Sequence, residues 1–319
     1  MRNTPLRPAL LIRRAGPPAL VPARGSRPDS IARDSSGCGA TTQGDRVMDI
    51  WLLGPLTAEV RGRSIVPTAA KPRQILALLA THANRVVPVA TLMEEIWGGE
   101  PPQSALATLH TYILQLRRQL TAAYGKDAGV SAKDVLVTQY GGYCWRAPAE
   151  SVDVPRYERL VAAGQAAAAE DEHGKASAHF REALALWRGS ALVDVRIGPV
   201  LSIEVARLEE SRLGVLERCV EADLRLGRHA EVLSELVELT GRHPLHEGLH
   251  AQCMAALYRA GRSWQALDVY QQLRRRLAEE LGLSPSPRLQ RLQQAVLAAE
   301  PWLDAPERGD DLLLDWIIG

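Results

Sequence analysis

From residue 156 to residue 298 the chain alternates between helical segments and short breakers. Apolar side chains recur at helical spacing at 156–169, 173–187, 200–226, 229–241, 246–260, 263–281 and 287–298. Glycine or proline interrupts the pattern at Gly189, Gly198, Pro199, Gly227, Pro244, Gly261, Gly282 and Pro285. Paired helices of this length are typical of tetratricopeptide-like repeats, which predicts an all-α helical-repeat domain over 151–300. An unspecialised helical bundle is the alternative.

Residues 48–150 follow a different pattern. Short β-favouring runs at 49–53, 57–60 and 64–67 predict a small antiparallel sheet. Helical segments follow at 72–83, 89–97 and about 103–123, and a β-hairpin is predicted at 135–146. Sheet, three helices and hairpin are the plan of a winged helix, whose third helix enters the major groove of DNA. The predicted fold class is therefore mainly α with a small β part.

The segment 103–123 carries two contrasting faces. One stripe is apolar and predicts packing against the rest of the domain: Leu106, Leu109, Ile113, Leu116 and Leu120. The other faces offer Thr111, Gln115 and Arg118, which suit base edges and phosphates. A solvated polar face on an ordinary helix is the alternative at this point.

The charge is unevenly distributed along the chain. Residues 48–150 hold ten basic and eight acidic residues, whereas 151–319 hold 20 basic and 26 acidic residues. An acidic helical domain repels phosphates. We therefore expect it to make protein contacts or sense a signal, whereas the charge of 48–150 permits a nucleic-acid-binding face there.

The two ends of the chain differ from the middle. Residues 1–47 hold eight arginines and many Pro, Gly and Ser without periodicity, which predicts a disordered extension or a start assigned too early, with Met48 as the natural start. An export signal is disfavoured, because no apolar core follows Arg13 and Arg14. A basic nucleic-acid-binding arm is the other alternative. The acidic tail 301–319 has enough apolar residues to dock.

Several function classes are excluded by what the sequence lacks. No apolar run approaches the roughly 20 residues that span a bilayer, so we expect no membrane partner. The four cysteines form no C-x-x-C pair, which indicates reduced thiols in a cytoplasmic protein. No phosphate-binding loop or G-x-S-x-G motif occurs, so we expect no catalytic residue, no cofactor and no enzyme activity.

Three histidines lie close together in the sequence at 243, 246 and 250. His246 and His250 are one helical turn apart, a spacing that can bind metal. Only Glu247 is near enough to add a further ligand, and His243 precedes Pro244. Surface or capping histidines are therefore the favoured interpretation, and no metal site is predicted.

Separated motifs in both halves carry a family resemblance. WLLGPL at 51–56, KPRQILALL at 71–79, LRRQL at 116–120 and GGY at 141–143 resemble the OmpR-type winged helix, the output domain of two-component phosphorelay regulators. ALALWRGSAL at 183–192 and AALYRAGR at 255–262 resemble the bacterial transcriptional activator domain (BTAD). In this order they resemble the Streptomyces antibiotic regulatory protein (SARP) family over residues 48–299.

The resemblance implies a function. It implies a sequence-specific transcriptional activator of a secondary-metabolite, often antibiotic, gene cluster. Such a protein binds direct repeats in double-stranded promoter DNA near the −35 region, as a homodimer on DNA, and recruits RNA polymerase holoenzyme. The alternative is a helical-repeat scaffold whose winged helix contacts only proteins, which should replace the polar stripe of the third helix with an apolar patch.

The resemblance also implies which residues act. Alignment with the OmpR pattern places Thr111 and Gln115 in the groove, flanked by Thr108 and by Leu114, which contacts a thymine methyl. The residues expected to hold phosphates or bring the wing to the backbone are Lys71, Arg73, Arg117, Arg118, Tyr140, Gly141 and Gly142. For Arg117 a structural ion pair is an equal alternative. The loop expected to face the polymerase is Gly98, Gly99, Glu100, Pro101 and Pro102.

Overall fold

The computed structural model describes residues 48–125, 129–304 and 313–314. The predicted extension 1–47 lies outside the described residues, as do 305–312 and 315–319 of the predicted tail. Among the helices that are described, none is long and apolar enough to cross a membrane.

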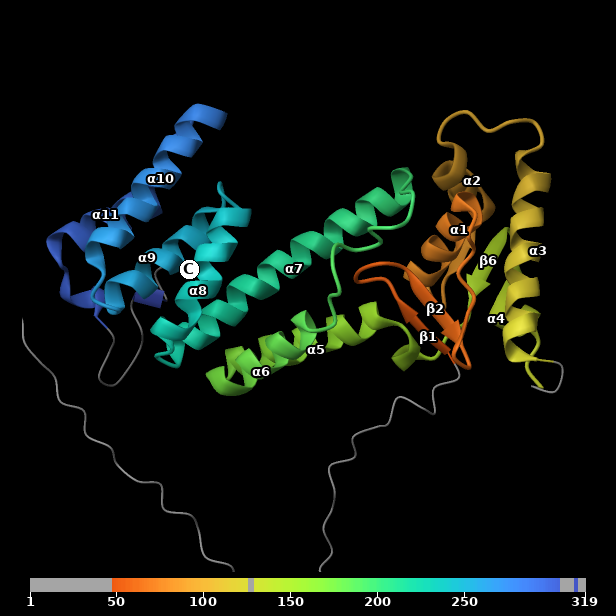
Figure 1. Ribbon diagram of the computed structural model, residues 1–319, viewed down its shortest axis with the longest axis horizontal. Helices are drawn as coiled ribbons and strands as arrows, with labels where there is room; N and C mark the ends of the chain where they lie inside the picture. The colour runs from red at the N-terminus through yellow and green to blue at the C-terminus, as the bar shows by residue number, and fades with distance from the viewer. Residues whose placement is uncertain (1–47, 126–128, 305–312, 315–319) are drawn as a thin grey trace, which may run out of the picture. The chain divides into compact units, whose positions relative to one another are not determined.

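The first sheet is antiparallel and has the order β1-β2-β3 (Figure 1). Its strands are β1 (Met48–Trp51), β2 (Thr57–Val60) and β3 (Arg63–Ser64). Ile50 pairs with Ala58, and both side chains are buried because directly opposed residues of an antiparallel pair lie on the same face of the sheet. The predicted sheet is confirmed, although its last strand is only two residues long.

The three predicted helices of this region are present as α1 (Ala70–Thr81), α2 (Val89–Trp97) and α3 (Ala105–Tyr124). The buried stripe of α3 runs through Leu109, Ile113, Leu116 and Leu120, as predicted. The prediction for Leu106 is wrong, since its side chain is 48% exposed and Ala105 is buried instead. Steps of three and of four back from Leu109 both stay near the buried stripe, so spacing alone does not decide between Leu106 and Ala105.

The second sheet contains the predicted hairpin and one strand that the sequence did not reveal. Its order is β4-β6-β5, with β4 (Val86–Pro88), β5 (Leu136–Gln139) and β6 (Gly142–Trp145). β4 is three residues long and runs directly into α2, so no alternating pattern could mark it. A short helix, α4 (Ala132–Val135), was likewise missed within the segment before the hairpin, although Ser131 closes a capping box there.

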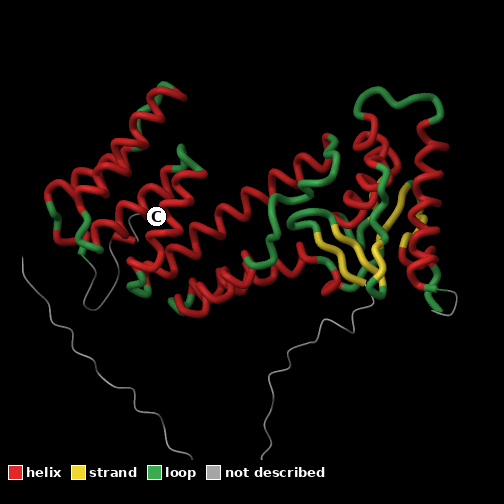
Figure 2. The backbone as a smooth tube through the Cα atoms, in the orientation of Figure 1, coloured by secondary structure: helices red, strands yellow, loops and turns green. Residues whose placement is uncertain are grey.

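The rest of the described chain is mainly helical, with one long loop at 185–198, and all seven predicted helices are present (Figure 2). They are α5 (Asp153–Ala169), α6 (His173–Leu184), α7 (Pro199–Arg225), α8 (His229–Arg242), α9 (Glu247–Arg259), α10 (Ser263–Leu281) and α11 (Pro287–Ala298). Helices adjacent in sequence pack together, as α5 with α6 and α9 with α10. This is the repeat-like pairing that the breakers predict.

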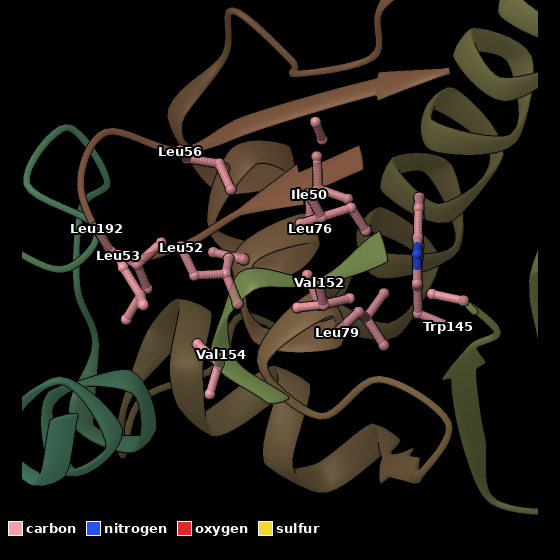
Figure 3. Packing of buried hydrophobic residues seen from close by; sticks show 14 of the residues in the cluster. Ile50, Leu52, Leu53, Leu56, Leu76, Leu79, Trp145, Val152, Val154 and Leu192 are labelled. Carbon is pink, nitrogen blue, oxygen red and sulfur yellow. The ribbon is translucent and has the colours of Figure 1, made fainter. Parts of the chain in front are cut away.

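The hydrophobic core crosses the predicted boundary at residue 150. One continuous cluster runs from the β1–β2 sheet and α1–α3 through Val152 and Val154 to Ala222 in α7. Figure 3 shows Leu53 beside Leu192, which precedes α7, and Ile50 near Val152. A second cluster fills α8–α11 and includes Leu313 and Leu314, so the described part of the tail does dock. The winged helix therefore shares its core with α5–α7.

A buried carboxylate in α2 caps the start of α7. Oε1 of Glu95 accepts hydrogen bonds from Gln74 Nε2 and the Gly198 N–H, both at 2.7 Å. Oε2 accepts from the N–H groups of Val200 and Leu201, both at 2.9 Å. These backbone groups open α7 and have no partner inside that helix. A Cβ on Gly198 would lie 2.1 Å from the Glu95 carbonyl oxygen, so only glycine fits there.

A second carboxylate joins β1 to α5. Oδ2 of Asp153 accepts hydrogen bonds from the N–H groups of Leu52 and Leu53 at 2.8 Å. Burial raises the pKa of Asp153 to about 6, against the opposing effect of these N–H donors and of Arg188. The carboxylates of Glu95 and Asp153 thus both accept hydrogen bonds from backbone N–H groups at the junction between the winged helix and α5–α7.

Replacing Glu95 with glutamine should weaken this junction. Glu95→Gln turns one acceptor oxygen into an NH₂ group that faces backbone donors, so we expect the free energy of unfolding to fall by about 2–4 kcal/mol. Urea denaturation of the full chain measures this. The exposed neighbour makes a matched control, since Glu94→Gln has the same charge change and should stay within about 0.5 kcal/mol of wild type. Equal losses in both variants would contradict the capping role.

Candidate nucleic-acid interface

The polar face predicted for the third helix is at the surface of α3. Thr111 and Arg118 are exposed, Leu114 is 52% exposed, and Thr108 and Gln115 are half-buried. At 100° per residue these positions share one side of the helix, opposite the buried stripe. α3 therefore presents to solvent one continuous face of all five residues.

The chemistry of this face suits a polyanion that also exposes hydrogen-bonding groups. The hydroxyls of Thr108 and Thr111 donate to the carbonyls one turn back, at 2.9 and 3.0 Å, so their oxygens retain acceptor capacity. Gln115 carries both donors and an acceptor, and Arg118 carries a cation. α3 contains no Asp or Glu, which leaves no like charge to repel phosphate.

Arg117 is used inside the protein. Its Nε and Nη2 donate to the Leu136 carbonyl at 3.0 and 2.7 Å, and Nη2 also donates to Thr138 Oγ1 at 2.7 Å. These bonds attach α3 to β5 and position the helix against the wing. The geometry favours the structural alternative over the predicted phosphate contact, with carbonyl and hydroxyl acceptors in place of an ion pair.

The two basic residues at the start of α1 also have internal partners. Nζ of Lys71 lies 5.0 Å from the centroid of the Trp97 ring, a cation–π contact. Arg73 donates to the Pro67 carbonyl at 3.2 Å and pairs with Asp194 at 3.3 Å. Arg73 therefore ties α1 to the segment before α7, which weakens the case for its predicted phosphate role.

The three residues predicted for the wing hairpin have two different structural roles. Tyr140 is fully exposed at the turn, and Gly141 adopts a φ of +78°, which favours glycine. Gly142 is buried, and a Cβ there would lie 2.3 Å from the Val87 carbonyl oxygen. Tyr140 and Gly141 form the tip, whereas Gly142 allows the close approach of β6 to β4.

The loop predicted to face the polymerase joins α2 to α3 (Figure 1). Gly98 ends α2 with a φ of +63° and is half-buried. The other four residues, Gly99, Glu100, Pro101 and Pro102, are exposed. Two consecutive prolines restrict the backbone of the exposed stretch, so the loop offers a stiff surface.

The cysteines and histidines have structural surroundings. Burial raises the pKa of Cys219 and of Cys253 to about 11, so these thiols stay protonated at neutral pH. His246 is the N-cap of α9 and accepts from the Leu249 N–H at 3.4 Å, which confirms a capping histidine. His250 is buried rather than at the surface. Within the described ranges no three His, Cys, Asp or Glu side chains gather as metal ligands.

An exposed polar third helix beside a hairpin, followed by helical repeats, is the arrangement of an OmpR-type winged-helix regulator of transcription. Residues 62–144 match the family model for the transcriptional regulatory protein, C terminal, and residues 152–297 match the bacterial transcriptional activator domain. The chain belongs to the Streptomyces antibiotic regulatory protein family of transcriptional activators, which are not enzymes.

Known relatives cover most of the chain. Regulatory protein DnrI of Streptomyces peucetius is 56% identical over 257 residues, 81% of this chain and 94% of its own length. Regulatory protein AfsR of Streptomyces coelicolor is 41% identical over 79% of this chain, which spans only 24% of that protein. The structure of Mycobacterium tuberculosis EmbR in complex with a low affinity phosphopeptide has a TM-score of 0.75 at 32% identity, covering 85% of this chain and 68% of that one.

The two neighbouring arginines of α3 should differ in their effect on stability. Arg117→Ala removes the hydrogen bonds to Leu136 and Thr138, so we expect the free energy of unfolding to fall by about 1–3 kcal/mol. The exposed Arg118 is the matched control, and Arg118→Ala should change it by less than about 0.5 kcal/mol. Urea denaturation separates the two, and an Arg117→Ala variant as stable as wild type would refute the structural assignment.

Proposed function

We propose that this protein activates transcription by binding double-stranded promoter DNA through α3 and the wing. The observation that carries the proposal is the exposed face of α3, which is polar, basic and free of acidic residues. Thr111 and Gln115 read base edges, with Thr108 and Leu114 beside them, and Arg118 holds phosphate. Tyr140 and Gly141 bring the wing tip to the backbone.

The proposal extends to the arrangement at the promoter. Two protomers bind direct repeats near the −35 region, as a homodimer on DNA, and the exposed loop from Gly98 to Pro102 contacts RNA polymerase holoenzyme. The target is a secondary-metabolite gene cluster, as the SARP family indicates, and the protein acts in the cytoplasm. Residues 151–319, the helical domain and the tail, together hold 20 basic and 26 acidic residues and are assigned to protein contacts.

A footprint tests the proposal as a whole. The full chain is titrated onto promoters from its own gene neighbourhood, with and without polymerase holoenzyme, at a fixed salt concentration because phosphate contacts make affinity salt-dependent. We expect protection of two direct repeats near −35 that polymerase strengthens. Protection no greater than on random DNA would favour instead a repeat scaffold whose winged helix binds only proteins.

Two substitutions on α3 separate base reading from phosphate binding. Gln115→Ala should weaken binding to the protected sequence by about 1–3 kcal/mol and leave binding to random duplex unchanged. Arg118→Ala should weaken both by similar factors and lower the salt dependence. Fluorescence anisotropy with both duplexes gives the dissociation constants. Equal losses on both duplexes for Gln115→Ala would exclude a base-reading role.

A further inference from the structure

A cavity of about 270 Å³ lies among α8, α9 and α10, within the helical domain and apart from the winged helix. α9 packs against both α8 and α10, and side chains of all three helices line the cavity. We call the α9 side its floor and the α8 and α10 sides its walls. His250 and Cys253 of α9 line the floor and are buried. The cavity is therefore a built feature of three packed helices.

The walls of this cavity carry exposed apolar side chains. Trp264 of α10 is 72% exposed and Val237 of α8 is 62% exposed, and both line the cavity. Single exposed apolar residues are common on protein surfaces. Here an indole and a branched side chain line the same concave site from different helices, which is the composition of a ligand pocket.

Two arginines line the cavity, and Nε of one of them, Arg262, donates to Gln265 Oε1. Arg276 is half-buried and lines the cavity, and among the described residues no ion pair or hydrogen bond satisfies its guanidinium. Asp268 lines the cavity too, but its Oδ2 accepts from Gln272 Nε2 at 2.6 Å. A partly buried arginine without a carboxylate partner is an unused anion-binding group.

His250 adds an acceptor beside this cation. Its Nδ1 lies 2.9 Å from the His246 carbonyl oxygen, and only a protonated Nδ1 can donate to that oxygen. Burial, with Arg276 nearby, lowers the pKa of His250, so the ring is neutral at pH 7 and Nε2 is an acceptor. His250 on the α9 side of the cavity thus offers an acceptor near the Arg276 guanidinium on the α10 side.

We propose that this cavity binds a small amphipathic anion, a flat aromatic ring system that carries a carboxylate. The ring packs on Trp264 and Val237, the carboxylate pairs with Arg276, and a hydroxyl on the ligand donates to His250 Nε2. A volume of about 270 Å³ suits a bicyclic ring and is too small for a folded peptide.

The test uses the full chain and two isosteric probes. 2-Naphthoate carries the ring and the charge, and 2-naphthamide carries the ring alone. Isothermal titration calorimetry should show 2-naphthoate binding to wild type, and 2-naphthamide at least tenfold more weakly. Trp264→Ala and Arg276→Gln should each weaken 2-naphthoate at least tenfold, whereas Arg276→Lys should retain part of the affinity.

The control lies on the same helix. Arg275 is exposed on α10 and is not among the cavity-lining residues, so Arg275→Gln has the same charge change and should leave 2-naphthoate affinity unchanged. Far-ultraviolet circular dichroism checks that each variant is folded. No binding of 2-naphthoate to wild type, equal affinity for both probes, or unchanged affinity in folded Trp264→Ala and Arg276→Gln variants would overturn the proposal.

Discussion

The arrangement of the protein depends on the buried carboxylate of Glu95. It comes from the middle of the winged helix and completes the hydrogen bonds that open α7, the longest described helix. A carboxylate away from water needs such donors, and the first turn of a helix needs such an acceptor. The winged helix thus supplies the acceptor for N–H groups of α7. In the reverse direction, Asp153 of α5 accepts hydrogen bonds from the Leu52 and Leu53 N–H groups at the end of β1.

Most of the fold could be predicted because its signals are local. The seven helices of the second half were visible from breakers and period alone, and the stripe of α3 from Leu109 to Leu120 was visible in the same way. The short strand β4 and helix α4 were not, because three or four residues carry no period. The exposure of Leu106 depends on how the first turn of α3 sits against its neighbours, which spacing alone does not give.

The sequence predicts where the candidate site lies better than it predicts which side chains of that region face solvent. Residue type cannot distinguish Arg117 from Arg118, because only the fold places the Leu136 carbonyl within reach of the first and solvent around the second. Gly142 presents the same difficulty, since its neighbour Val87 is distant in sequence. The face of α3 could be found because it depends on helical geometry alone, and its contact with DNA stays a prediction.

The shared core between the winged helix and α5–α7 also bears on how such chains can be rearranged. Many regulators join a recognition domain to an effector domain through a linker, and either part is exchangeable. Here the cluster that holds Ile50 also holds Val154 and Leu208, so a junction placed at residue 150 would divide one core. The smallest unit that keeps this core whole is the winged helix together with α5, α6 and most of α7. Substitutions on the exposed face of α3 change that face and leave the shared core whole.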